Sequence, residues 1–174
     1  QYSGLFIDGT LKSPTIIERD KPMNIQLRRN LVDNCINDER EYRRCCQNNY
    51  LNATVQDRGA FNSEEFYVSV GSREIVAIFK AGEKHSPQDR AFDFYLPKTI
   101  ETGVYTLPST GQLIEIAFTE FLPPYATYYA FKGVLDLFVS ADKREYSGSF
   151  NTHFKDKQNR EFTSEGAFAF SLEN

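Results

Sequence analysis

The two histidines are the first side chains to consider for chemistry, because nucleophilic catalysis needs a nucleophile, a base and a group that orients the base. The chain contains only His85 and His153. His85 lies in a hydrophilic segment, and His153 falls on the polar side of an alternating C-terminal segment. No Gly-x-Ser-x-Gly motif accompanies them. We therefore predict two solvent-exposed histidines and no catalytic residues, and a hydrolase that joins a cysteine to a histidine remains an alternative.

Carboxylates offer a second kind of acid–base chemistry, which paired acids perform in many hydrolases. Glu115, Glu120 and Asp136 lie inside otherwise apolar segments. A small hydrolase that uses Glu115 with Asp136 is therefore part of the same alternative. An acid on one side of a strand is also ordinary wherever that side meets water. We favour the interpretation that these acids lie on strand faces that meet water.

A run of tyrosines between residues 123 and 131 is the strongest candidate for a binding surface. Alternation places Tyr125 and Tyr129 on one side and Tyr128, flanked by alanines, on the other. Tyrosine suits sugars and protein partners, because it combines rigid apolar area with a hydroxyl group. We predict that Tyr125, Tyr128 and Tyr129 bind a ligand. The competing interpretation is that this row forms the rim of the core.

The three cysteines, Cys35, Cys45 and Cys46, are confined to one short region. No Cys-x-x-Cys pair or neighbouring histidine accompanies them, so we predict no metal site. Apolar residues from Asn30 to Asn49 recur near helical spacing and predict an amphipathic helix. A straight helix would separate residues ten apart by about 15 Å, whereas a disulfide needs α-carbons within about 7 Å. The periodicity favours the helix, and export would favour a disulfide among these cysteines.

Composition excludes several classes of function. The net charge is −4, and the basic residues are scattered, so we predict no nucleic-acid partner. The glycines form neither a dinucleotide-binding motif nor a phosphate-binding loop, and we predict no cofactor. No apolar run approaches the ~18 residues that a membrane-spanning helix needs. The chain begins at Gln1 rather than at Met, which indicates that a leader or an expression tag preceded it; a lipid anchor upstream of Gln1 is compatible with this.

Most of the chain is predicted to form strands. Hydrophobic residues make up 40% of it and aromatic residues 14%, with 15 Phe and 10 Tyr, and these aromatic residues favour strands. From about Phe61 onward, apolar and polar residues alternate between turn signals. The predicted strands cover residues 66–70, 75–79, 91–96, 104–107, 113–121, 125–131, 134–140, 145–154 and 161–172. The last two are predicted to form a hairpin.

We predict a single, mainly β domain over residues 1–174: an antiparallel β-sandwich or flattened barrel of about eight to ten strands. Residues 1–60 are predicted to form a helix-containing region packed on it. Gly148 and Gly166 occupy matching places in the two hairpin strands, where the absence of a side chain permits sharp coiling.

The order of features over residues 92–174 resembles an uncharacterised class of bacterial exported β domains that are often found in lipoproteins. The residues that carry the resemblance are Leu96-Pro97, Gly103-Val104-Tyr105, Gly133-Val134-Leu135, Ser147-Gly148-Ser149-Phe150 and Gly166-Ala167-Phe168. The resemblance implies export and a β-sandwich-like fold. It implies no activity, because the class has no assigned function.

These observations favour a non-catalytic binding domain that acts outside the cytoplasm, in the periplasm, at the cell surface or after secretion. A protein or a carbohydrate is the expected partner. The alternatives are an inhibitor or immunity-type protein that binds a toxin or an enzyme, and the small hydrolase described above.

Overall fold

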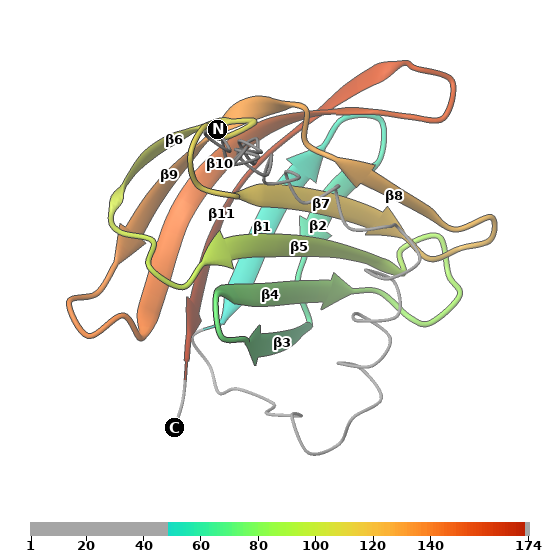
Figure 1. The fold of residues 1–174 in the computed structure, drawn as a ribbon. Coiled ribbons are helices and arrows are strands. Elements are labelled where there is room, and N and C mark those ends of the chain that lie inside the picture. The colour runs from blue at the N-terminus through green and yellow to red at the C-terminus, as the bar shows by residue number, and fades with distance from the viewer. Residues whose placement is uncertain (1–48, 173–174) are drawn as a thin grey trace, which may run out of the picture.

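Two antiparallel sheets stack face to face in the computed structural model, which describes residues 49–172 (Figure 1). One sheet has six strands in the order β2–β1–β11–β10–β9–β6, and the other has five in the order β3–β4–β5–β7–β8. The strands are β1 (Tyr50–Val55), β2 (Gly59–Asn62), β3 (Glu65–Val70), β4 (Glu74–Ala81), β5 (Arg90–Pro97), β6 (Gly103–Leu107), β7 (Glu115–Glu120), β8 (Ala126–Tyr129), β9 (Lys132–Val139), β10 (Glu145–Lys155) and β11 (Glu161–Ser171). Residues 49–172 contain no helix. The prediction of an antiparallel, sandwich-like β fold is confirmed.

The strands begin earlier in the chain than the sequence indicated. β1 starts at Tyr50 and pairs with β11, so it lies inside the six-stranded sheet. The segment from Tyr50 to Asn62 therefore belongs to the sandwich, although strands were expected only from about Phe61. The helix predicted over Asn30–Asn49 falls almost wholly outside the described residues, and the three cysteines fall entirely outside them. The helix and the possible disulfide therefore stay predictions.

Phenylalanine rings fill the space between the two sheets. Phe94 of β5 lies 4.6 Å from Phe168 of β11, measured between ring centroids, and Phe92 lies 5.5 Å from Phe150 of β10. These four rings are at most 3% exposed. Contacts between tilted or edge-on rings at such distances add to the free energy gained by burying their apolar area. The aromatic residues that predicted strands thus also form the interface that joins the sheets.

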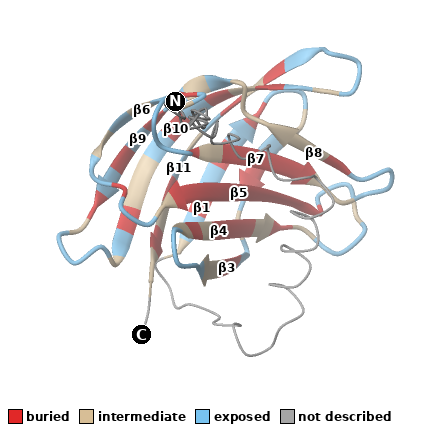
Figure 2. Ribbon diagram, in the orientation of Figure 1, coloured by how far each residue is buried: buried red, intermediate tan, exposed pale blue. Residues whose placement is uncertain are grey.

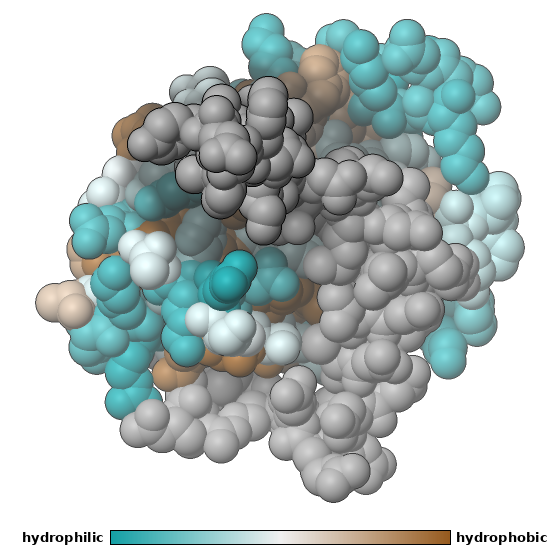
Figure 3. All heavy atoms as spheres, in the orientation of Figure 1, coloured by the Kyte–Doolittle hydropathy of each residue, from teal (hydrophilic) through white to brown (hydrophobic). Residues whose placement is uncertain are grey.

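The predicted hairpin of β10 and β11 is confirmed. It is the longest strand pair among the described residues, with eleven residues in each strand. Phe150 and Phe154 on β10 are buried, while Ser149 and Asn151, on either side of Phe150, are exposed, so the colours alternate along the strands in Figure 2. The loop from Asp156 to Arg160 joins the strands and forms hydrophilic surface at the upper right of Figure 3. Alternation of this kind gives the six-stranded sheet one apolar and one polar face.

The five-stranded sheet has a different character, because its central strands are buried on both faces. Side chains that point away from the Phe-rich interior, including Ile78, Tyr95 and Ala117, are at most 3% exposed. Figure 2 shows β5 as an almost continuous buried strand. The apolar run from Ile75 to Phe79 was interpreted as a central strand, and the structure places it in β4, between β3 and β5.

Candidate functional site

A shallow groove of about 700 Å³ lies on the outer face of the six-stranded sheet. It crosses five of the six strands, from β9 to β2. The residues that line it are Asn52, Ala53, Thr54, Ala60, Asn62, Val134, Asp136, Ser149, Phe150, Asn151, Glu165, Gly166 and Ala167. Most of these are outward-facing members of alternating strands, and the inward-facing Ala53 and Phe150 are themselves buried in the core.

Strand pairing places the outward side chains of the groove in two parallel rows. The first row runs from β6 to β2 through Val104, Asp136, Ser149, Ala167, Asn52 and Asn62. The second row runs in the same direction through Thr106, Val134, Asn151, Glu165, Thr54 and Ala60. Every one of these twelve residues is exposed. Neighbouring strands lie about 4.8 Å apart, so the part from β9 to β2 spans roughly 19 Å.

Small residues in the middle of the groove let the strands approach each other and leave space above them. A Cβ atom added to Gly166 would lie 2.5 Å from the carbonyl oxygen of Asn52 and 2.7 Å from the Cβ of Ala53. A Cβ atom added to Gly148 would overlap the carbonyl oxygen of Asp136. Both glycines face inward between large core residues. Both glycines therefore occupy positions where a neighbouring strand lies too close for a side chain, whereas their places in the sequence were interpreted as permitting sharp coiling.

The polar side chains of the groove are not engaged in the fold. Among the described residues, no hydrogen bond or ion pair involves the side chains of Asn52, Asn62, Asn151, Asp136 or Glu165. Each amide offers two N–H donors and a carbonyl acceptor, and each carboxylate offers acceptors only. The lining has two acids and no lysine or arginine. The groove therefore offers many hydrogen-bonding groups to a ligand and disfavours anions.

Exposed apolar side chains border the groove. Val104, on the edge strand β6, is 69% exposed, and Phe138, next in line to Asp136 on β9, is 53% exposed. On β1, Tyr50 precedes Asn52 on the same face and is 43% exposed. Phe138 and Tyr50 belong to one row, with Ser147 and Ala169 between them. A third row therefore lies beside the first one. It has an aromatic ring at each end and the small residues Ser147 and Ala169 between them.

The predicted tyrosine surface is divided between different sides of the five-stranded sheet. Tyr128 points inward, with its ring 5.2 Å from that of Phe162, and packs against the core. Tyr129 is the next residue on β8 and points to the opposite face, and Tyr125 lies 39% exposed in the loop before β8. The structure therefore does not bring the three rings to one surface. For Tyr128, the interpretation as a rim of the core fits its contacts.

The carboxylates considered for catalysis are also kept apart. Glu115 on β7 belongs to the outer face of the five-stranded sheet, whereas Asp136 on β9 belongs to the outer face of the six-stranded sheet. The core separates these two faces, so the residues do not form a pair. Asp136 is exposed in the groove.

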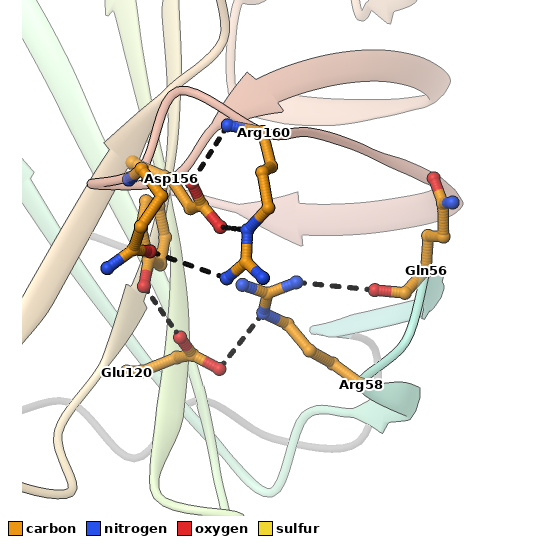
Figure 4. Close-up of polar contacts among 7 residues, drawn as sticks. Gln56, Arg58, Glu120, Asp156 and Arg160 are labelled. Carbon is orange, nitrogen blue, oxygen red and sulfur yellow. Dashed lines mark hydrogen bonds and ion pairs between the residues drawn. The ribbon is translucent and has the colours of Figure 1, made fainter.

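Glu120, the third carboxylate, takes part in a polar cluster at one end of the sandwich (Figure 4). Its carboxylate accepts a hydrogen bond from the Arg58 Nε at 3.1 Å and another from the Tyr128 hydroxyl at 2.9 Å. The Arg58 guanidinium lies 3.8 Å from the ring centroid of Phe162. Burial, the hydrogen bond to Glu120 and the charge of Glu120 raise the pKa of Tyr128 above its ordinary value of 10.0, while Arg58 acts in the opposite direction.

Arg90 fixes the turn that carries Arg58. This guanidinium is buried and donates hydrogen bonds to the carbonyl oxygens of Arg58 and Ala60, at 2.9 and 2.8 Å. Burial lowers the pKa of Arg90, an effect that Glu120 opposes and Arg58 reinforces. Arg90 belongs to β5, whereas the carbonyls of Arg58 and Ala60 belong to the β1–β2 turn and to β2, so the contact joins the two sheets. We interpret the whole cluster as a structural clamp that holds β2 at the end of the groove.

The structure also separates the two histidines. His85 is exposed in the loop between β4 and β5, where its backbone N–H donates to the Asp89 carboxylate at 2.7 Å. His153 lies on β10, in the other sheet, with its ring centroid 6.3 Å from that of Phe131. Within residues 49–172, no group of three or more His, Cys, Asp or Glu side chains is arranged to hold a metal ion. No helix in that range has the length and hydrophobicity to cross a membrane.

The residues of the groove were missed as a set, although part of the signal was present. Leu51, Ala53 and Val55 alternate with Tyr50, Asn52 and Thr54, and the same test that found β10 and β11 would have found β1. The contribution of β2 to the groove depends on strand pairing and has no comparable local signal. Comparisons with protein-family models, curated proteins and solved structures found no match to this chain.

Proposed function

We propose that the protein is a non-catalytic binding domain that acts outside the cytoplasm, and that the groove on the six-stranded sheet is its binding surface. One observation carries this proposal: the groove presents a dense set of exposed amides, hydroxyls and carboxylates that make no hydrogen bonds within the described fold. Groups left uncommitted across a wide concave surface favour recognition of a ligand. The residues considered for acid–base catalysis lie apart from one another, which also favours binding over catalysis.

The groove can be tested by filling it. Ala167 lies near its centre between Ser149 and Asn52, and its exposed side chain leaves room for a larger one. We expect Ala167→Arg to leave the fold intact and to abolish retention of the purified protein on isolated cell-envelope material from the source organism. Ala141→Arg places the same side chain on an exposed turn outside the groove and serves as the matched control. Equal retention of both variants and the unaltered protein would contradict the proposed site.

The location of the protein is a separate part of the proposal, supported by the resemblance of residues 92–174 to exported β domains. Fractionation of cells that express the complete gene provides the test. We expect the protein in the envelope, periplasmic or culture-medium fraction. Recovery in the cytoplasmic fraction alone would overturn this part of the proposal and would leave the groove unaffected.

A further inference from the structure

We infer that the ligand of the groove is an extended, uncharged oligosaccharide that lies across the strands. This inference rests on the proposed function and specifies the ligand of the same site. It follows from three properties of the groove: the arrangement of its hydrogen-bonding groups, its charge and its position on a sheet face.

The arrangement of hydrogen-bonding groups matches a chain of hydroxyl-rich units. In the first row, Asp136, Ser149, Asn52 and Asn62 present polar atoms on four different strands. In the second row, Asn151, Glu165 and Thr54 do the same on three strands. Sugar hydroxyls both donate and accept hydrogen bonds, so amides, hydroxyls and carboxylates all pair with them. Because the polar groups repeat over roughly 19 Å, they suit several linked sugars better than a single one.

The charge of the groove separates neutral from acidic sugars. Asp136 and Glu165 are both exposed, and the lining contains no basic side chain that would offset them. A glycan that carries carboxylates or sulfates would place like charges together, which is unfavourable for binding. Uncharged sugars meet no such penalty. The apolar borders formed by Val104, Val134 and Phe138 can contact the C–H faces of sugar rings.

The position of the groove disfavours a peptide ligand. Extended peptides gain affinity mainly by pairing with the free backbone groups of an edge strand. The groove lies mainly on a sheet face, over β9, β10, β11 and β1, each of which already pairs with a strand on both sides, and only its end reaches the edge strand β2. It is also shallow, so it lacks the buried pocket in which a peptide or protein partner anchors a large side chain.

Titration of the protein with defined oligosaccharides, followed through its backbone amide NMR signals, tests the inference. The uncharged probes are cellohexaose, maltohexaose and mannohexaose, and the acidic probe is a galacturonate hexamer. We expect at least one uncharged probe, and not the acidic one, to shift amide signals of β1, β10 and β11. Asn52→Ala removes one amide from the first row and should weaken this binding about five-fold, the effect of losing one hydrogen bond.

A second set of variants tests the role of charge. We expect the double change Asp136→Asn with Glu165→Gln to allow binding of the acidic probe. Glu161→Gln is the matched control, because Glu161 is an exposed acid on the same strand as Glu165 but lies outside the groove. Unchanged exclusion of the acidic probe in the double variant would contradict the charge argument.

The possible outcomes distinguish a failure of the oligosaccharide inference from a failure of the proposed binding surface. If none of the uncharged probes shifts any signal, the inference of an oligosaccharide ligand is overturned. If a hexalysine peptide shifts the groove signals instead, the ligand inference fails while the proposed function stands, with a protein partner as in the inhibitor or immunity-type alternative. If an oligosaccharide binds but shifts signals elsewhere, and Ala167→Arg leaves its affinity unchanged, the proposed binding surface fails as well.

Discussion

The two faces of the six-stranded sheet differ sharply, although the same strands supply both. On the inner face of β11, Phe162, Phe168 and Phe170 are at most 3% exposed and pack among other aromatic rings. On its outer face, Glu165 and Ala167 are exposed and form part of the groove. The difference indicates a division of roles: the inner face determines the free energy of folding, and the outer face is available for a ligand without cost to the fold. The following predictions test this division.

The largest effect is expected for two phenylalanines on opposite faces of the six-stranded sheet, Phe168 on β11 and Phe138 on β9. Phe168→Ala should lower the free energy of unfolding by about 3–5 kcal/mol, because it leaves a cavity among the inner rings. Phe138→Ala, on the outer face, should change it by no more than about 0.5 kcal/mol. Denaturation with urea measures both. Equal losses would show that the two faces do not have separate roles.

A smaller loss of stability is expected at Gly148, where the inner face leaves no room for a side chain. Gly148→Ala would place a Cβ atom against the carbonyl oxygen of Asp136 on the neighbouring strand. We expect overpacking to lower the free energy of unfolding by about 1–3 kcal/mol. Ser149→Ala, the next residue and outward-facing, is the control in thermal melting experiments. Equal melting temperatures for the two variants would show that the neighbouring strand leaves room for a side chain at Gly148.

The Tyr128 hydroxyl, at one end of the sandwich, should make the stability of the fold depend on pH. The pKa of Tyr128 is raised above 10.0, chiefly by burial, so the folded state favours the protonated phenol. Its contribution to stability is therefore fully present below pH 10.0 and is lost as the pH rises through the folded-state pKa. Burial also raises the pKa of Tyr146, so alkaline titration of tyrosine absorbance should show more than one late-ionising group, and Tyr128→Phe should remove one of them. Loss of an early-ionising group instead would contradict the burial of this hydroxyl.

The smallest effect on folding is expected for the polar rows of the groove. Asn151 is exposed, and among the described residues its side chain makes no hydrogen bond. Asn151→Ala should change the free energy of unfolding by no more than about 0.5 kcal/mol. The same variant should weaken binding of the uncharged oligosaccharide about five-fold. A large loss of stability, measured by the same urea denaturation, would show that the outer face also supports the fold.

Local alternation explains why much of the fold was predictable. The strands from β3 to β11 and the C-terminal hairpin follow from local patterns, either alternating apolar and polar residues as in β10 or an apolar run such as Ile75 to Phe79. β1 was missed because it was read as part of a different N-terminal region. Tyr128 and Tyr129 lie on opposite sides of β8, as alternation predicts, whereas Tyr125 lies in the loop before it, and no local pattern reveals which side of a strand faces the core.

The groove illustrates the limit of sequence interpretation. Its residues come from β1, β2, β9, β10 and β11, and none of these strands carries a local motif for binding. The separation of Glu115 from Asp136 was equally hidden, because both lie in similar alternating segments and only the assignment of strands to sheets distinguishes them.

The sequence by itself determined that this protein forms antiparallel strands, because the pattern of apolar residues that predicts a strand acts within that strand. Only the tertiary structure decided which strands become neighbours. The pairing of Leu51 with Phe168 brings the beginning of the described chain beside its end and places Asn52 next to Ala167. Pairing over such a distance depends on the packing of the whole core, and the polar rows of the groove exist only as a result of it.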